Sequence, residues 1–265
     1  MNQLPSRPLP TKTLLRKPKD DVSTRLFCFP YSGLGASMYN RWPRIIGDVE
    51  ICLVQPPGRE NRIREAHFGT YENLAEDLID SLAPYLDRPF GFFGHCGGAL
   101  SAFATAVALK DAGLPAPEQL FMSSQVAPHE GPYGRFLSMS NSELAEELVT
   151  LTRALGGIPN PDMLAMSLRV LRADISANQQ YKLLHATPLS SSLVAIGWSD
   201  DSEISPSMMH GWRNFAAPDA YREIVLEGNH HAFLDAPDEL LNLFSSSLRP
   251  ADETPASASP ERITP

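Results

Sequence analysis

A cysteine lies between glycines in the segment Gly94-His95-Cys96-Gly97-Gly98. The spacing is that of a nucleophile elbow, in which a sharp turn between a strand and a helix raises the nucleophile above a sheet. A helix that begins directly after the turn favours an anion at its N-terminus, here the Cys96 thiolate. The pattern predicts Cys96 as the nucleophile of an acyl-transfer enzyme, with the backbone N–H of Gly97 as an oxyanion donor.

The other two cysteines, Cys28 and Cys52, lie inside short apolar runs. Cysteine in such a run is commonly a small core residue, so we expect neither to be catalytic. The three cysteines show no Cys-x-x-Cys spacing and no neighbouring pair of histidines, which does not favour a zinc site. We therefore expect no metal and no cofactor.

The acid and the histidine of a triad on such an elbow follow the nucleophile in that order, each after a strand. Asp200 and Asp201 follow one predicted strand, and either could orient and stabilise an imidazole. His230 and His231 follow the last predicted strand, so their order leaves the base ambiguous. We interpret His95, next to the nucleophile, as structural.

Short apolar runs alternate with longer helical patterns along most of the chain. The runs are residues 25–29, 50–54, 89–93, 118–122, 193–196 and 222–226. Helical patterns cover residues 71–86 and 99–112, and the second ends at Gly113, a typical residue after a helix C-terminus. This alternation predicts an α/β fold with a mostly parallel sheet that helices cover on both faces.

Residues 140–186 break the alternation because they contain no strand candidate. Ser140 and Glu143 have the spacing of a capping box that opens a helix, residues 156–161 interrupt it, and residues 162–180 are helical again. We predict a helical insert that acts as a lid over the ends of the strands.

Composition limits the remaining possibilities. The 265 residues carry a net charge of −9, which argues against binding to nucleic acid or to an anionic membrane surface. No apolar run approaches the roughly 20 residues that span a bilayer, and no apolar leader is present, so we expect a cytoplasmic protein. Residues 1–23 and 249–265 lack periodicity and are predicted to be disordered tails around one domain, 24–248.

Several spaced motifs together resemble the type II thioesterases that serve nonribosomal peptide and polyketide synthases. In chain order they are residues 29–33, 55–59, 94–98, 171–174, 197–200 and 228–230. The resemblance covers roughly residues 24–248 and implies the α/β-hydrolase fold, with the helical insert as the lid.

The resemblance also implies roles for individual residues. Asp200 matches the acid of a Gly-x-x-Asp pattern, and His230 matches the base of a Gly-x-His pattern. A His-x-Phe-Leu spacing fits His231 as the alternative base. The backbone N–H groups of Ser32 and Gly97 match the oxyanion donors. The implied substrate is an acyl or aminoacyl group on the phosphopantetheine arm of an acyl or peptidyl carrier protein.

The nucleophile departs from the family pattern, because most members carry serine where this chain has Cys96. Transfer from a phosphopantetheine thiol to serine loses thioester free energy and leads to hydrolysis. Transfer to cysteine forms another thioester, so the exchange is nearly thermoneutral and suits delivery to a second carrier, as in a minority of relatives that resemble aminoacyl shuttles.

Two hypotheses follow from this departure: hydrolysis of carrier-bound thioesters and transfer from carrier to carrier. A carrier-binding protein without activity is disfavoured by the acid and histidine in the correct order. A small-molecule hydrolase without a protein partner is disfavoured only by the resemblance.

Overall fold

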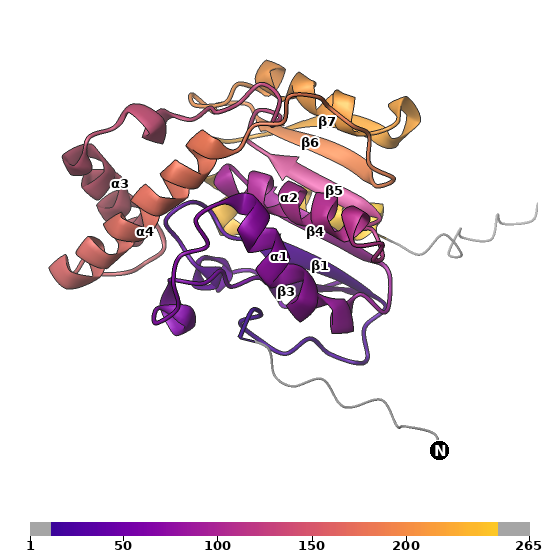
Figure 1. The fold of residues 1–265 in the computed structure, drawn as a ribbon, viewed down its shortest axis with the longest axis horizontal. Helices are drawn as coiled ribbons and strands as arrows, with labels where there is room; N and C mark the ends of the chain where they lie inside the picture. The colour runs from indigo at the N-terminus through magenta and orange to yellow at the C-terminus, as the bar shows by residue number, and fades with distance from the viewer. Residues whose placement is uncertain (1–11, 249–265) are drawn as a thin grey trace, which may run out of the picture.

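Seven strands form a single sheet in the computed structural model, which describes residues 12–248 (Figure 1). They are β1 (Thr24–Phe29), β2 (Ile45–Ile46), β3 (Val49–Leu53), β4 (Phe90–His95), β5 (Gln119–Ser123), β6 (Ser192–Trp198) and β7 (Tyr221–Leu226). Their order is β2-β3-β1-β4-β5-β6-β7, and only β2 runs antiparallel to its neighbour. The six predicted strands are confirmed, and β2, with two residues, was too short to predict.

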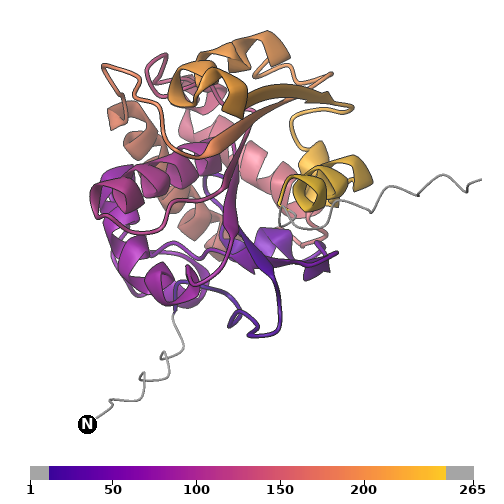
Figure 2. The ribbon, with the colours of Figure 1, turned by 90° about the vertical axis from the view of Figure 1, so that its right-hand side faces the viewer.

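Helices cover both faces of this sheet, as predicted. Figure 2 shows α1 (Tyr71–Leu82) and α2 (Gly97–Asp111) on one face and the C-terminal α5 (Asp238–Ser247) on the other. Successive residues of β1 enter different cores: Phe27 packs with the α1 and α2 side, and Cys28 packs with the α5 side. Burial on both faces explains why the inner strands are continuous apolar runs.

The order of the strands determines where a site can form. β1 lies between β3 and β4, so the chain leaves β1 first toward one edge of the sheet and later continues on the other side. Ligands of open α/β sheets bind beyond the carboxyl ends of the strands at such a switch point. Ser32 follows β1 and Cys96 follows β4, so the topology places both there.

The predicted helical insert contains α3 (Asn141–Ala154) and α4 (Pro161–Gln180), which pack against each other. In Figure 1 the pair extends beyond the sheet at the left of the view. The capping box is present, because the Ser140 side chain accepts from the Glu143 N–H and the Glu143 side chain accepts from the Ser140 N–H. The function of the pair as a lid remains a prediction.

The predicted N-terminal tail needs a correction. Leu14 is 4% exposed and pairs with Val54, and the Leu15 N–H donates to the Leu53 carbonyl. Residues 13–15 therefore pair with residues 53–55 at the end of β3, although residues 12–23 show no periodicity of their own. The rest of the prediction, residues 1–11, and the C-terminal tail, residues 249–265, lie outside the described residues. No helix in the described part of the chain has the length and apolarity to cross a bilayer.

Two glycines should differ in what they contribute to stability. A Cβ on Gly94 would overlap the carbonyl of Gly98, because β4 and α2 approach closely at the elbow. Gly113 has φ +66° but open space around it, so Gly113→Ala should cost only the conformational penalty, about 1 kcal/mol of unfolding free energy. Gly94→Ala should cost about 3 kcal/mol, because backbone must move. Urea unfolding monitored by tryptophan fluorescence measures both, and equal losses would contradict the steric explanation.

Candidate active site

Cys96 occupies the turn between β4 and α2 with φ 53° and ψ −125°. A non-glycine residue in this region stores about 1–3 kcal/mol of strain and persists only where its surroundings enforce it. Close packing at Gly98 holds the turn in place, because a Cβ at this position would lie only 2.7 Å from the Phe29 carbonyl oxygen. The cysteine precedes the first residue of the 15-residue α2, where the helix dipole favours an anion. These features match the predicted elbow.

The other cysteines lie away from this turn, inside β1 and β3. Cys28 is fully buried and Cys52 is 3% exposed. Burial raises the pKa of both thiols well above the ordinary value, and neither forms a disulfide. Both behave as core residues at neutral pH, whereas Cys96 is 9% exposed.

The two predicted oxyanion donors lie side by side. Ser32 follows β1, and a Cβ on Gly97 would overlap its hydroxyl oxygen. The next residue of the loop, Gly33, has φ +79°, and its N–H donates to the Asp174 carboxylate at 2.7 Å. The structure therefore brings the Ser32 loop to the start of α2, and the donor roles of Ser32 and Gly97 remain predictions.

The carboxylate next to the histidine pair belongs to Asp201. Its Oδ2 lies 2.9 Å from His230 Nδ1 and accepts from Ser124 Oγ at 2.7 Å. Its Oδ1 accepts from the backbone N–H groups of Glu203 and Ile204 at 2.8 and 3.0 Å. Four donors thus surround a side chain that is fully buried.

The assignment of the acid to Asp200 is corrected to Asp201. Asp200 is exposed, and its backbone N–H donates to the Gly228 carbonyl. Adjacent residues at the end of β6 point to different sides, and the turn closed from the Asp201 N–H to the Trp198 carbonyl directs only Asp201 inward. A Gly-x-x-Asp count selects the first aspartate because it contains no information about this turn.

Of the two histidines, His230 is the one that contacts both Cys96 and Asp201. It is 4% exposed, its ring shares a hydrogen bond with the Cys96 thiol, and its Nε2 lies 3.4 Å from the Tyr31 hydroxyl. The His231 ring lies edge-on to that of His230, with centroids 5.3 Å apart. The geometry is that expected for His230 as the base, which remains a prediction of its role.

The two rings also differ in charge. Burial alone lowers the pKa of His230, but its hydrogen bonds with Asp201 and Cys96 outweigh burial and raise the pKa to about 10. Burial and the neighbouring His230 lower the pKa of His231 to about 4. At pH 7 His230 is thus protonated and His231 neutral. An imidazolium beside a cysteine favours the thiolate, which is the attacking form.

His95 is structural, as interpreted from its position in the elbow. Its Nδ1 lies 2.9 Å from Ser123 Oγ, and its ring stacks on Phe233 with centroids 3.9 Å apart. Burial holds its pKa well below the ordinary value, so it remains neutral. A neutral ring packed in this way supports the loop that carries His230.

A buried ion pair connects the predicted lid to the oxyanion loop. Arg59 donates two hydrogen bonds to Asp174 of α4, at 2.7 and 2.8 Å, and His67 Nε2 lies 2.7 Å from the same carboxylate. Asp174 also holds Gly33, as described above. Burial raises the pKa of Asp174, but Arg59 and His67 outweigh burial and lower the pKa to about 2. Sequence motifs contained Arg59 and Asp174, but their pairing was not predicted.

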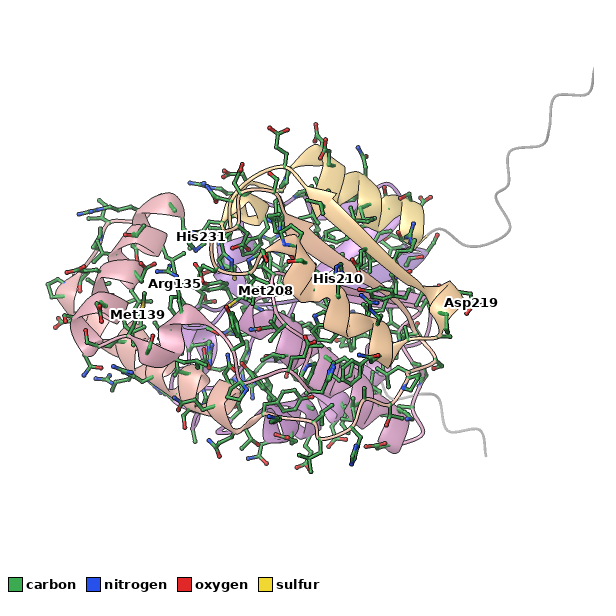
Figure 3. All side chains as sticks on the ribbon, turned by 90° about the horizontal axis from the view of Figure 1, so that it is seen from above. Arg135, Met139, Met208, His210, Asp219 and His231 are labelled. Carbon is green, nitrogen blue, oxygen red and sulfur yellow. The ribbon has the colours of Figure 1, made fainter. Side chains whose placement is uncertain are left out.

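A cavity of about 780 Å³ opens beside His230. Its walls include Tyr133, Arg135, Leu137, Glu203, His230 and His231. Figure 3 labels Arg135 and His231, which come from segments on either side of β6 in the sequence. Sequence reasoning missed Arg135 and Glu203, which carry no motif.

Three of these groups could also hold a metal ion. One ligand atom each from Glu203, His230 and His231 lies within 4.8 Å of the others. A metal ion needs neutral imidazoles, and the proton that His230 holds at neutral pH opposes binding. The sequence-based expectation of a metal-free enzyme remains a prediction.

Comparison with known proteins identifies relatives along nearly the whole chain. Residues 24–248 match the thioesterase domain family. Linear gramicidin dehydrogenase LgrE of Brevibacillus parabrevis is 32% identical, over 91% of this chain and 94% of its own. The gramicidin S biosynthesis protein GrsT of Aneurinibacillus migulanus is 28% identical, over 85% and 89%.

Solved structures agree with these matches. The RedJ thioesterase from the prodiginine pathway of Streptomyces coelicolor is 33% identical with a TM-score of 0.73, covering 91% of this chain and 97% of its own. The type II thioesterase BorB from the borrelidin biosynthetic cluster is 25% identical with a TM-score of 0.78, covering 91% and 100%. The α/β-hydrolase fold predicted from the sequence is confirmed.

The two aspartates should differ in their effect on Cys96. Asp201→Asn removes the carboxylate that orients His230 and raises its pKa, so the histidine should assist Cys96 less well. Alkylation of Cys96 by iodoacetamide, followed by peptide mass spectrometry, should slow by about tenfold or more, the low end of what loss of a hydrogen bond to a charged group produces. Asp200→Asn should react at the wild-type rate.

The same measurement separates the histidines, with His230→Ala slowed and His231→Ala unaffected. A larger loss in Asp200→Asn than in Asp201→Asn would show that the correction is mistaken.

Proposed function

We propose that this chain, which belongs to the thioesterase domain family, cleaves acyl or aminoacyl thioesters from phosphopantetheinyl carrier proteins through an acyl-Cys96 intermediate. The observation that carries the proposal is the contact series from Cys96 to His230 to Asp201 on a nucleophile elbow. The relatives support the setting, because the names of GrsT and RedJ place them in gramicidin S and prodiginine biosynthesis. We accordingly assign the enzyme to a nonribosomal peptide or polyketide assembly line in the cytoplasm.

The acylation step follows from the geometry of the triad. The Cys96 sulfur attacks the thioester carbonyl, and the N–H groups of Ser32 and Gly97 stabilise the oxyanion. The carbon–sulfur bond to phosphopantetheine then breaks, and the His230 imidazolium gives its proton to the departing thiolate. Asp201 keeps the imidazole oriented throughout. No cofactor is needed for this step, because the phosphopantetheine arrives with the carrier.

The second step decides between two functions. In hydrolysis, neutral His230 takes a proton from water, which attacks the acyl-Cys96 carbonyl and releases the acid. In transfer, the thiol of a second carrier attacks instead and leaves with the acyl group. The cysteine itself favours transfer as the second candidate, because thioester exchange between thiols is nearly thermoneutral and conserves the activated bond.

Hydride transfer, which the name of the dehydrogenase LgrE suggests for that protein, has no support in this site. The described segment after β1 leads into a 3₁₀ helix of four residues, Ala36–Tyr39. A dinucleotide site would require a long helix there, whose N-terminus binds the pyrophosphate. The residues at the switch point are instead those of a nucleophile elbow and its triad.

The acyl-enzyme should be directly detectable. Incubation with an acyl-loaded carrier should add the mass of the acyl group to Cys96, because this thiol alone combines exposure with an activating histidine. Intact-protein mass spectrometry followed by peptide mapping identifies the site. Cys28→Ala and Cys52→Ala serve as matched controls and should still be labelled. An adduct that persists in Cys96→Ala would rule out the proposed intermediate.

The fate of the intermediate distinguishes hydrolysis from transfer. Wild type is mixed with an acyl-loaded carrier and an excess of an empty second carrier, and both products are followed over time. Free acid alone indicates the hydrolase, and acyl transfer to the second carrier indicates the shuttle. For a shuttle, Cys96→Ser should accept the group as a lower-energy ester and pass it on poorly. For a hydrolase, the same variant should retain release of the acid.

A further inference from the structure

One carboxylate at the reaction centre has no role in the mechanism above. The Glu203 side chain is 12% exposed and lines the cavity beside the triad. Its backbone N–H donates to Asp201 Oδ1 at 2.8 Å, so the loop that orients the acid also fixes Glu203. Its Oε2 lies 3.8 Å from His230 Nε2, beyond hydrogen-bond distance. The carboxylate therefore faces the nitrogen that serves the nucleophile.

The surrounding charges leave this carboxylate incompletely neutralised. Glu203 Oε1 contacts Arg135 Nε at 2.6 Å, but the same guanidinium donates to Glu147. Arg135 is the one Lys or Arg among the residues that line the cavity. One guanidinium thus faces two carboxylates. Protonated His230 adds a positive charge 3.8 Å from Glu203 in the free enzyme, but in the proposed mechanism the ring gives up that proton when Cys96 is acylated. A partly desolvated negative charge is unfavourable until a cation joins it.

The position of this charge relates it to a particular part of the substrate. In the acyl-Cys96 intermediate, the α-carbon is bonded to the carbonyl carbon, which is bonded to the sulfur. In the free enzyme the Cys96 thiol lies beside the His230 ring, and His230 and Glu203 line the same cavity. A substituent on the α-carbon that points into the cavity therefore comes within reach of the carboxylate.

We propose that Glu203 is a specificity-determining residue that binds the free α-ammonium of an aminoacyl group on Cys96. The inference rests on the proposed function and names its substrate class. The ammonium donates to Oε2, and Arg135 retains Oε1, so the added cation balances the second carboxylate. An aminoacyl thioester then gains a charge-assisted hydrogen bond that the same acyl group without its amine lacks.

The cavity walls disfavour a long fatty acyl chain. Arg135, Glu203 and His231 place polar or charged atoms along the volume that an alkyl chain would fill. Burying those atoms against hydrocarbon would remove water from them without replacing its hydrogen bonds. Tyr133 and Leu137 leave an apolar portion of the wall that suits a side chain of modest size.

The test compares two acyl groups that differ only in the amine. One carrier is loaded with leucyl and another with 4-methylpentanoyl, and kcat/KM for thioester loss is measured on each. Wild type should prefer leucyl. Glu203→Gln keeps the shape but removes the charge, and should lower the leucyl preference about 10- to 100-fold, the range of a hydrogen bond to a charged group. Glu203→Asp should restore part of the preference.

Glu147→Gln is the matched control, because it also removes a carboxylate from Arg135 but lies outside the cavity lining. It should lower the leucyl preference much less than Glu203→Gln does, because Glu203 keeps its charge and Arg135 only becomes free to pair with it more fully. A role of Glu203 confined to holding Arg135 or the loop would slow both substrates equally and leave the ratio unchanged. An unchanged ratio in Glu203→Gln overturns the inference, while loss of either thioester upholds the proposed function.

A binding measurement does not depend on thioester activity. Leucinamide, which has the ammonium, should protect Cys96 of wild type from iodoacetamide more than 4-methylpentanamide does. Glu203→Gln should abolish that difference, and Glu147→Gln should retain most of it. Equal protection by the two amides in wild type would overturn the ammonium site. If protection differs but neither carrier is cleaved, the proposed function fails and the ammonium site stands.

Discussion

The close approach of β4 and α2 is the constraint on which the rest of the site depends. The backbone at Gly94 and Gly98 leaves no room for a side chain, and Cys96 between them is held at φ 53°. In this conformation Cys96 follows the end of β4 and is 9% exposed, whereas Cys28 and Cys52 lie inside strands and are 0% and 3% exposed. The turn also places the sulfur at the N-terminus of α2, where an anion is favoured.

The remaining groups reach the nucleophile from separate strands. Ser32 comes from the loop after β1, Asp201 from the turn after β6, and His230 from the loop after β7. Parallel strands end at one edge, so loops distant in sequence converge without long connections. The ion pair of Arg59 with Asp174 adds α4 to this convergence, because the same carboxylate holds the oxyanion loop. Movement of α4 would therefore shift the loop that carries Ser32.

The charges of the site form a continuous series. Asp201 and the Cys96 thiol stabilise protonated His230, which in turn suppresses protonation of His231. Glu203 extends the series into the cavity and connects it to Arg135. In the proposed function, the charges that surround Cys96 and His230 thereby also provide a place for a cation beside the acyl group. Activation of the nucleophile and selection of the substrate thus share one set of charges.

Local pattern determined the framework. The six apolar strands, α1, α2 and the capped α3 follow from periodicity and from turn residues. The pattern of apolar and polar side chains along the chain shows which residues of a strand or helix are buried. The elbow around Cys96 is equally local. β2 escaped prediction because two residues carry no period. The packing of residues 12–23 was not predicted, because the backbone hydrogen bonds that hold part of this segment are made with residues at the end of β3 and just after it.

Tertiary structure decided what adjacent or distant residues do. Sequence spacing does not distinguish Asp200 from Asp201. Only the turn at Trp198 directs one of the two carboxylates to His230. The contacts of Glu203 with Arg135 and His230 join segments far apart in the chain, so no spacing could indicate them. The sequence by itself determined the fold and the elbow that carries Cys96, because both depend on neighbours along the chain. The acid and the charged cavity depend on which side chains meet in space, which only the folded sheet decides.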